Sequence, residues 1–206
     1  WAWTQQQAYR DLVVNPEWRD EVRDALPEAL IGAFDRNFAA GATLRELTSP
    51  RDTLPDWRIV EPPPAEELLG HYEAAEAEFG VGWEYLAAIH LVETRMGRIR
   101  GVSTAGARGP MQFMPATWDA YGTGDIDDPG DAIRAAARYL TASGAPEDMR
   151  SALFAYNRSD HYVDAITAHA EVMADDERAY LAYHHWQVHY RLDTGDVVLP
   201  VGWERE

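Results

Sequence analysis

The chain has 206 residues, enough for one sizeable core or two small ones, and its 46% apolar content is ordinary for a soluble globular protein. It carries 35 acidic and 18 basic side chains, so its net charge of -17 disfavours binding to nucleic acid or to an anionic membrane surface. The absence of cysteine excludes disulfides and zinc-thiolate sites. No segment approaches the roughly 20 apolar residues that a membrane-spanning helix needs.

The first part of the chain, residues 1–62, is predicted to be a helical N-terminal extension. The segment "NPEWRDEVRDAL" offers Asn15 as an N-cap, and "PEALIGAFDRNFAAG" predicts a helix from Pro27 that ends at Gly41. This helix repeats apolar side chains at helical spacing: Ile31, Phe34 and Phe38. They need a partner surface, so we interpret the extension as a cap packed on the rest. The proline run in "EPPPAEELL" marks its end.

The second part, residues 63–183, is a succession of helical patterns separated by short turns rich in glycine and proline. In the third part, residues 184–206, apolar and polar side chains alternate. The apolar side chains that would share one face of a strand are Trp186, Val188, Tyr190 and Leu192. The segment "DTGD" separates this run from "VVLPVGW", as expected for a β-hairpin. The fold class predicted from these patterns is mainly α-helical with a short C-terminal hairpin.

A glutamate interrupts the apolar face of one predicted helix. In "VGWEYLAAIHLVETRMG", which should end at Gly97, Glu93 falls within the arc of apolar side chains. A carboxylate there must be paired, accept hydrogen bonds or protonate more readily, because desolvation disfavours the ion. One interpretation is structural, an ion pair with a neighbouring arginine: Arg95, Arg98, Arg100 or Arg108. The other is an acid with a raised pKa that gives and recovers a proton.

The following segment favours the second interpretation. Residues 101–118, "GVSTAGARGPMQFMPATW", hold three glycines and two prolines, so their backbone is too irregular for a helix. Irregular backbone after a buried glutamate suits a substrate cleft, where Ser103, Thr104 and Gln112 offer neutral hydrogen-bonding groups. Further along, "EDMRSALFAYN" ends in Tyr156 and Asn157, which taken alone would pass as a core tyrosine and a helix C-cap.

Together these segments resemble the soluble lytic transglycosylases, lysozyme-like enzymes that cleave the glycan strands of peptidoglycan. The resemblance covers about residues 65–175 and rests on the order of four elements: "HLVETRMG", "STAGARGPMQFMPATW", "DPGDAIRAAARYL" and "ALFAYN". The form of the second element is similar to exported actinobacterial members. Thr94 and Pro110 depart from the serine and leucine that the family often has at those positions. The resemblance implies a lysozyme-like helical domain and assigns no role to the extension or the tail.

The resemblance also implies the residues of the site. It makes Glu93 the single catalytic acid/base and assigns substrate binding to five others: Ser103, Met111, Gln112, Tyr156 and Asn157. Ser103 would hold the carboxyl or the N-acetyl group of the substrate, and Met111 with Gln112 would line the sugar site. The hydroxyl of Tyr156 would lie beside the glutamate, while Asn157 would fix the turn. No cofactor and no metal is implied.

The implied reaction cleaves the β-1,4 bond between N-acetylmuramic acid and N-acetylglucosamine and leaves a 1,6-anhydromuramic end. This reaction needs one carboxylate, whereas ordinary glycosidases use two. The stretch from Thr94 to Trp118 contains no carboxylate, although Asp119 or Asp125 could fold back towards the site. Two alternatives remain, a hydrolytic muramidase on the same scaffold and a catalytically silent glycan-binding or scaffold domain.

Two further clusters suggest metal sites only weakly. The segment "GDIDDPGD" lacks the closing glutamate of an EF-hand, and Asp128 is better explained as the cap of a helix that Pro129 begins. The histidines in "HHWQVH" are expected to form a surface cluster, with His185 and His189 on the same solvent side of a strand.

The expected partner is the peptidoglycan glycan strand, and nucleic acid is not expected. The extension would offer a surface to a cell-wall or membrane-anchored partner. The resemblance implies that the protein acts outside the cytoplasm, at the cell envelope. The absence of an export signal before Trp1 is uninformative, because such a signal could have been removed without trace.

Overall fold

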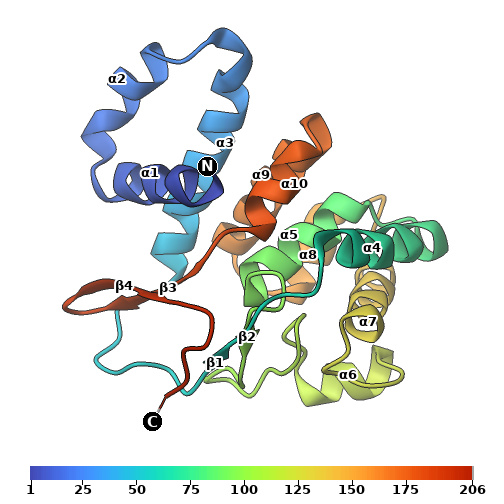
Figure 1. Cartoon of the computed structure of the whole chain (residues 1–206). Helices are drawn as coiled ribbons and strands as arrows, with labels where there is room; N and C mark the ends of the chain where they lie inside the picture. The colour runs from blue at the N-terminus through green and yellow to red at the C-terminus, as the bar shows by residue number, and fades with distance from the viewer. Residues whose placement is uncertain (206) are drawn as a thin grey trace.

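The computed structural model describes residues 1–205, and helices dominate it (Figure 1). The N-terminal helices are α1 (Ala2–Val14), the 3-10 turn η1 (Pro16–Trp18), α2 (Arg19–Asp24) and α3 (Glu28–Leu47). The following helices are α4 (Ala65–Phe79), α5 (Trp83–Thr94), α6 (Pro115–Tyr121), α7 (Pro129–Ala142), α8 (Met149–Tyr156), α9 (Asp160–Asp175) and α10 (Arg178–His184). The strands are β1 (Arg58–Ile59), β2 (Ile99–Arg100), β3 (Val188–Leu192) and β4 (Gly195–Leu199). The predicted fold class, mainly α-helical with a short hairpin, is confirmed.

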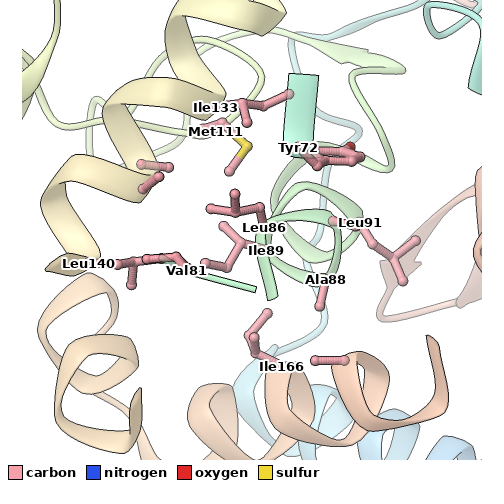
Figure 2. Packing of buried hydrophobic residues seen from close by; sticks show 14 of the residues in the cluster. Tyr72, Val81, Leu86, Ala88, Ile89, Leu91, Met111, Ile133, Leu140 and Ile166 are labelled. Atoms are coloured by element: carbon pink, nitrogen blue, oxygen red, sulfur yellow. The ribbon is translucent and has the colours of Figure 1, made fainter. Parts of the chain in front are cut away.

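Helix α5 lies at the centre of the hydrophobic core. It packs against α4, α7 and α9, so almost its whole circumference is covered. Its apolar side chains from Leu86 to Leu91 are fully buried among residues of those helices, including Ile133 and Ile166 (Figure 2). A helix that is apolar on all sides is stable only inside a protein. This burial is what makes a carboxylate on the last turn of α5 unusual.

The N-terminal extension packs directly on the rest of the chain. Figure 1 shows α9 between α3 on one side and α5 and α8 on the other, in agreement with the contacts among these helices. Phe34 of α3 is buried, so the predicted apolar stripe does meet a partner surface. Polar contacts add to this packing. Tyr183 donates a hydrogen bond of 2.7 Å to Asn37 Oδ1, and Arg36 forms salt bridges with Glu171 and Asp175.

Of the two boundaries predicted in the extension, the helix end at Gly41 was wrong. Helix α3 continues through Gly41 to Leu47. A Cβ at position 41 would lie only 3.0 Å from the side chain of Val13 of α1. Glycine is therefore used here for the close approach of two helices and not as a terminator. Asn15 stands at the N-cap of η1 directly before Pro16, as predicted, but its side-chain amide donates to the carbonyl of Asp11 and so closes the C-terminal end of α1.

The C-terminal hairpin forms as predicted. Strands β3 and β4 pair antiparallel from Val188 opposite Leu199 to Leu192 opposite Gly195. Val188 and Leu199 are buried with Ile59 of β1 in a second, smaller apolar cluster. Reciprocal hydrogen bonds of 2.8 Å between Gln6 and Gln187 tie α1 to the start of the hairpin.

The expected surface cluster of histidines does not form. His184 is buried, with its Nε2 2.9 Å from the carbonyl of Pro63, and it belongs to α10. His189 stacks on Trp3 with ring centroids 5.7 Å apart, and burial lowers its pKa to about 3. Only His185 is exposed. The alternation predicted the strand correctly but could not show that α1 covers His189.

None of the helices within residues 1–205 is both long enough and apolar enough to cross a membrane.

Candidate active site

Glu93 lies on the last turn of α5 and is only partly exposed. Burial raises the pKa of its carboxyl group from 4.5 to about 7. A hydrogen bond of 2.8 Å from the Tyr162 hydroxyl to Oε1 acts in the opposite direction, because it stabilises the carboxylate. A carboxyl group whose pKa is raised towards neutrality is suited both to donate and to accept a proton.

The alternative of a structural ion pair fails for Glu93. No arginine among residues 1–205 forms a salt bridge with it, and no neighbouring charge contributes to its pKa shift. Arg98 instead bonds to Glu61 and to the carbonyl of His184, while Arg100 donates to the carbonyl of Asp127. The proximity of arginines in sequence was misleading, because they point to other parts of the fold.

The hydrogen bond to Glu93 comes from a residue that the sequence analysis missed. Tyr162 is in the first turns of α9, and its ring lies parallel to that of Tyr156, with centroids 6.4 Å apart and an interplanar angle of 4°. Tyr156 donates its hydroxyl to the carbonyl of Met111 at 2.7 Å, so the expected contact of this hydroxyl with the glutamate is replaced by one from Tyr162. A tyrosine on the buried face of α9 was the available signal, since a buried hydroxyl needs a partner.

The loop after α5 is tied to the helix that carries Glu93. The Thr94 hydroxyl donates to the carbonyl of Pro110 at 2.6 Å and accepts from the Gly97 amide at 3.1 Å. A serine at position 94 would offer the same hydroxyl, so the departure from the family pattern keeps this chemistry. The bond to position 110 uses only its backbone, which is why proline is tolerated there.

Ser103 stabilises the loop itself. Its hydroxyl accepts a hydrogen bond of 2.9 Å from the amide of Ala107, and the backbone groups of the same two residues form a second bond of 2.9 Å. Neither of these bonds involves Glu93. Within residues 1–205, Ser103 therefore forms no hydrogen bond with Glu93, and it remains partly exposed.

Met111 and Gln112 lie in a tight turn closed by backbone hydrogen bonds between Arg108 and Phe113. The Met111 side chain is fully buried in the cluster of Figure 2, so it does not line a surface that a sugar can reach. Gln112 has φ 51° and donates its amide to the carbonyl of Gly109 at 3.0 Å. Left-handed backbone at a residue other than glycine is strained and is found preferentially at functional sites.

Asn157 follows α8 in extended conformation and terminates that helix, as predicted. Beside it, Tyr156 contacts Phe113 and Tyr139, with ring centroids 6.0 and 5.7 Å apart. The Tyr139 hydroxyl donates to the carbonyl of Ala155. These contacts hold the end of α8 against the loop that follows α5.

The acidic loop before α7 is explained by its own hydrogen bonds. The Asp128 side chain accepts from the Asp131 amide and caps α7, as predicted, while Asp131 accepts from the Asp125 amide. Within residues 1–205, no cluster of three or more histidine or acidic side chains has the arrangement of a metal site.

Comparison with known proteins agrees with this architecture. Residues 71–180 match the family model of the transglycosylase SLT domain, which is more than half of the chain. The chain belongs to this family. It is also 27% identical over 122 residues to a protein of Thiobacillus denitrificans named membrane-bound lytic murein transglycosylase F. That match covers 55% of this chain and 26% of the relative, so the chain spans about a quarter of the relative's length. No solved structure matches the chain.

Proposed function

We propose that the protein is a peptidoglycan lytic transglycosylase in which Glu93 is the single acid/base. The observation that carries this proposal is a largely buried carboxyl group with a pKa of about 7, on a helix of an SLT domain, with no charged partner. The name of the relative supports the substrate class, because it describes an enzyme that acts on murein.

In the proposed reaction, protonated Glu93 donates its proton to the β-1,4 oxygen between N-acetylmuramic acid and N-acetylglucosamine. The acetamido oxygen of the muramic residue bonds to the anomeric carbon as the glycosidic bond breaks. The Glu93 carboxylate then removes the proton from the 6-hydroxyl, whose oxygen displaces the acetamido oxygen at that carbon. A 1,6-anhydro ring forms, the glutamic acid is regenerated and no water is consumed.

Product analysis tests this reaction directly. Mass spectrometry of purified peptidoglycan digested with the protein should give fragments that are one water lighter than products of hydrolysis. Fragments ending in reducing muramic acid would contradict the proposal and establish the hydrolytic muramidase in its place. If intact strands bind without cleavage, the domain is a silent glycan-binding module.

We expect replacement of Tyr162 by phenylalanine to alter the pH profile. Loss of its hydrogen bond removes stabilisation of the Glu93 carboxylate, so the pKa of Glu93 should rise further and the alkaline limb of kcat/KM should move to higher pH. Turnover should fall by about tenfold, because the carboxyl group is no longer oriented. The Tyr85→Phe variant is the control, because Tyr85 is a partly buried tyrosine of the same helix as Glu93. An unchanged profile for Tyr162→Phe would mean that the hydroxyl has no role.

The remaining assignments extend the same proposal. Ser103, Gln112 and Asn157 would bind the glycan strand through their polar groups, with Tyr156 beneath them. The protein would act at the cell envelope, and its domains would be divided at about residues 62 and 183. The extension, which packs on α9, would present its outer surface to a cell-wall or membrane-anchored partner.

A further inference from the structure

A groove of about 540 Å³ lies between the start of α1 and the end of α10. Its walls are formed by Trp1 and Trp3 from the start of α1, and by Leu181, His185 and Gln187 from α10 and the segment after it, with two alanines between them. No residue of the candidate active site is among these. The groove is therefore a concave surface separate from the site of Glu93.

Hydrogen bonds and ring stacking fix the tryptophan wall of the groove. Gln6 exchanges two hydrogen bonds of 2.8 Å with the backbone of Gln187. The ring of Trp3 stacks on that of His189 with centroids 5.7 Å apart, and Gln7 Nε2 lies 3.3 Å from His189 Nε2. Trp3 is nonetheless 42% exposed. One face of this indole is thus held against β3, while its exposed part lines the groove.

The lining of the groove contrasts with the acidic surface of the protein. The chain has 35 acidic side chains and a net charge of -17, yet no Asp, Glu, Lys or Arg lines the groove. Its polar groups are an amide and an imidazole. Gln187 Oε1 and the ring of His185 form no hydrogen bond with residues 1–205. Such a surface favours a neutral ligand that has apolar faces for the indoles and hydroxyl or amide groups at its edges.

We propose that this groove binds an uncharged oligosaccharide of N-acetylated sugars. A sugar ring has C–H groups on its faces, which pack on an indole, and its hydroxyl and acetamido groups form hydrogen bonds at the edge. The volume of the groove is in the range of small-molecule sites, so it fits a few sugar rings. The net charge of -17 disfavours an anionic membrane as the occupant. The choice of N-acetylated sugars rests on the proposed function. A strand held in the groove stays on the enzyme at a point away from the bond that is cleaved.

NMR spectra of the isotope-labelled full chain test the groove. Glu93→Gln is introduced so that no result depends on cleavage, and the probe is the β-1,4-linked tetramer of N-acetylglucosamine. The indole N–H signal of Trp3, identified by its absence from the Trp3→Phe spectrum, should shift saturably with the tetramer. The signal of Trp18, which is 49% exposed in η1 and does not line the groove, should stay in place. An unmoved Trp3 signal, or equal shifts of both, would overturn the proposal. A shift with an uncharged trileucine peptide and none with the sugar would also overturn it, in favour of a peptide site.

Two variants from different walls measure the contribution of the groove to strand binding. In the Glu93→Gln chain, Trp3→Ala and Leu181→Asp should each weaken adsorption to insoluble peptidoglycan by about tenfold. The first removes the stacking surface, and the second places a charge in the neutral groove. Leu181 is 51% exposed, so Leu181→Asp keeps the fold even if Trp3→Ala loosens the start of α1.

The matched controls are Trp18→Ala and Leu30→Asp, which make the same changes at exposed positions outside the groove. Both should adsorb as the Glu93→Gln chain does. Equal adsorption of Leu181→Asp and Leu30→Asp would overturn the proposal. A wild-type chain that fails to cleave peptidoglycan would contradict the proposed function and leave the tetramer result unchanged, so the two failures are distinguishable.

Discussion

The Glu93→Gln variant should lose glycan cleavage by a factor on the order of 10² to 10⁴ while still binding peptidoglycan. Glutamine keeps the shape of the side chain and can still accept the hydrogen bond from Tyr162, but it cannot donate the proton that the glycosidic oxygen needs. The release of soluble fragments from purified peptidoglycan measures cleavage, and sedimentation with insoluble peptidoglycan measures binding.

The matched control is Glu84→Gln. Glu84 is on the first turn of α5, and burial also raises its pKa, so this variant removes a carboxyl group from the same helix far from Tyr162. It should retain wild-type cleavage. If Glu93→Gln keeps more than a tenth of the activity with its fold intact, another group supplies the proton. If it unfolds while its folded fraction cleaves normally, Glu93 is structural.

Acid should destabilise the protein from about pH 6.5 downwards. Burial lowers the pKa of His90 and of His169 from 6.5 to about 3, as it does for His189, so between these values the unfolded chain binds a proton on each of these histidines that the folded chain does not. The free energy of unfolding then falls as the pH falls, by about 1.4 kcal/mol per pH unit for each histidine. Glu93 has the opposite effect between about pH 7 and 4.5, because its folded pKa is raised.

Urea unfolding at a series of pH values measures this dependence. The His169→Phe variant keeps an aromatic ring against Tyr183 and Trp186 but cannot be protonated, so its stability should decline less steeply below pH 6.5. Glu93→Gln should decline more steeply between pH 7 and 4.5. Equal slopes for the wild type and His169→Phe would show that this histidine is already protonated, or exposed, in the folded state.

Local patterns predicted the features that depend on near neighbours. The hairpin, the Asp128 cap of α7 and the position of Glu93 on a buried helix all follow from periodicity and capping chemistry within a few residues. The family of the domain could be predicted too, because four short segments occur in the expected order along one part of the chain.

Features that depend on distant contacts could not be predicted. Tyr162 is 69 residues from Glu93, and only the packing of α9 on α5 brings them together. Met111 was expected at the sugar site, but its turn directs the side chain into the core. The end of α5 was placed at Gly97, whereas the left-handed residue that closes it is Arg95. Sequence rules expect glycine at such positions, so the left-handed conformation of an arginine is visible only in the structure.

The position of α9 between the extension and the core has a practical consequence for truncated forms of the protein. A fragment trimmed to the family-matched residues 71–180 would remove α3, together with Tyr183 and Trp186, and would leave one flank of α9 bare. Such a fragment would carry Tyr162 on a helix whose opposite flank is exposed to solvent. Aggregation or altered activity of this fragment would say little about the full chain. Kinetic work should therefore begin with all 206 residues.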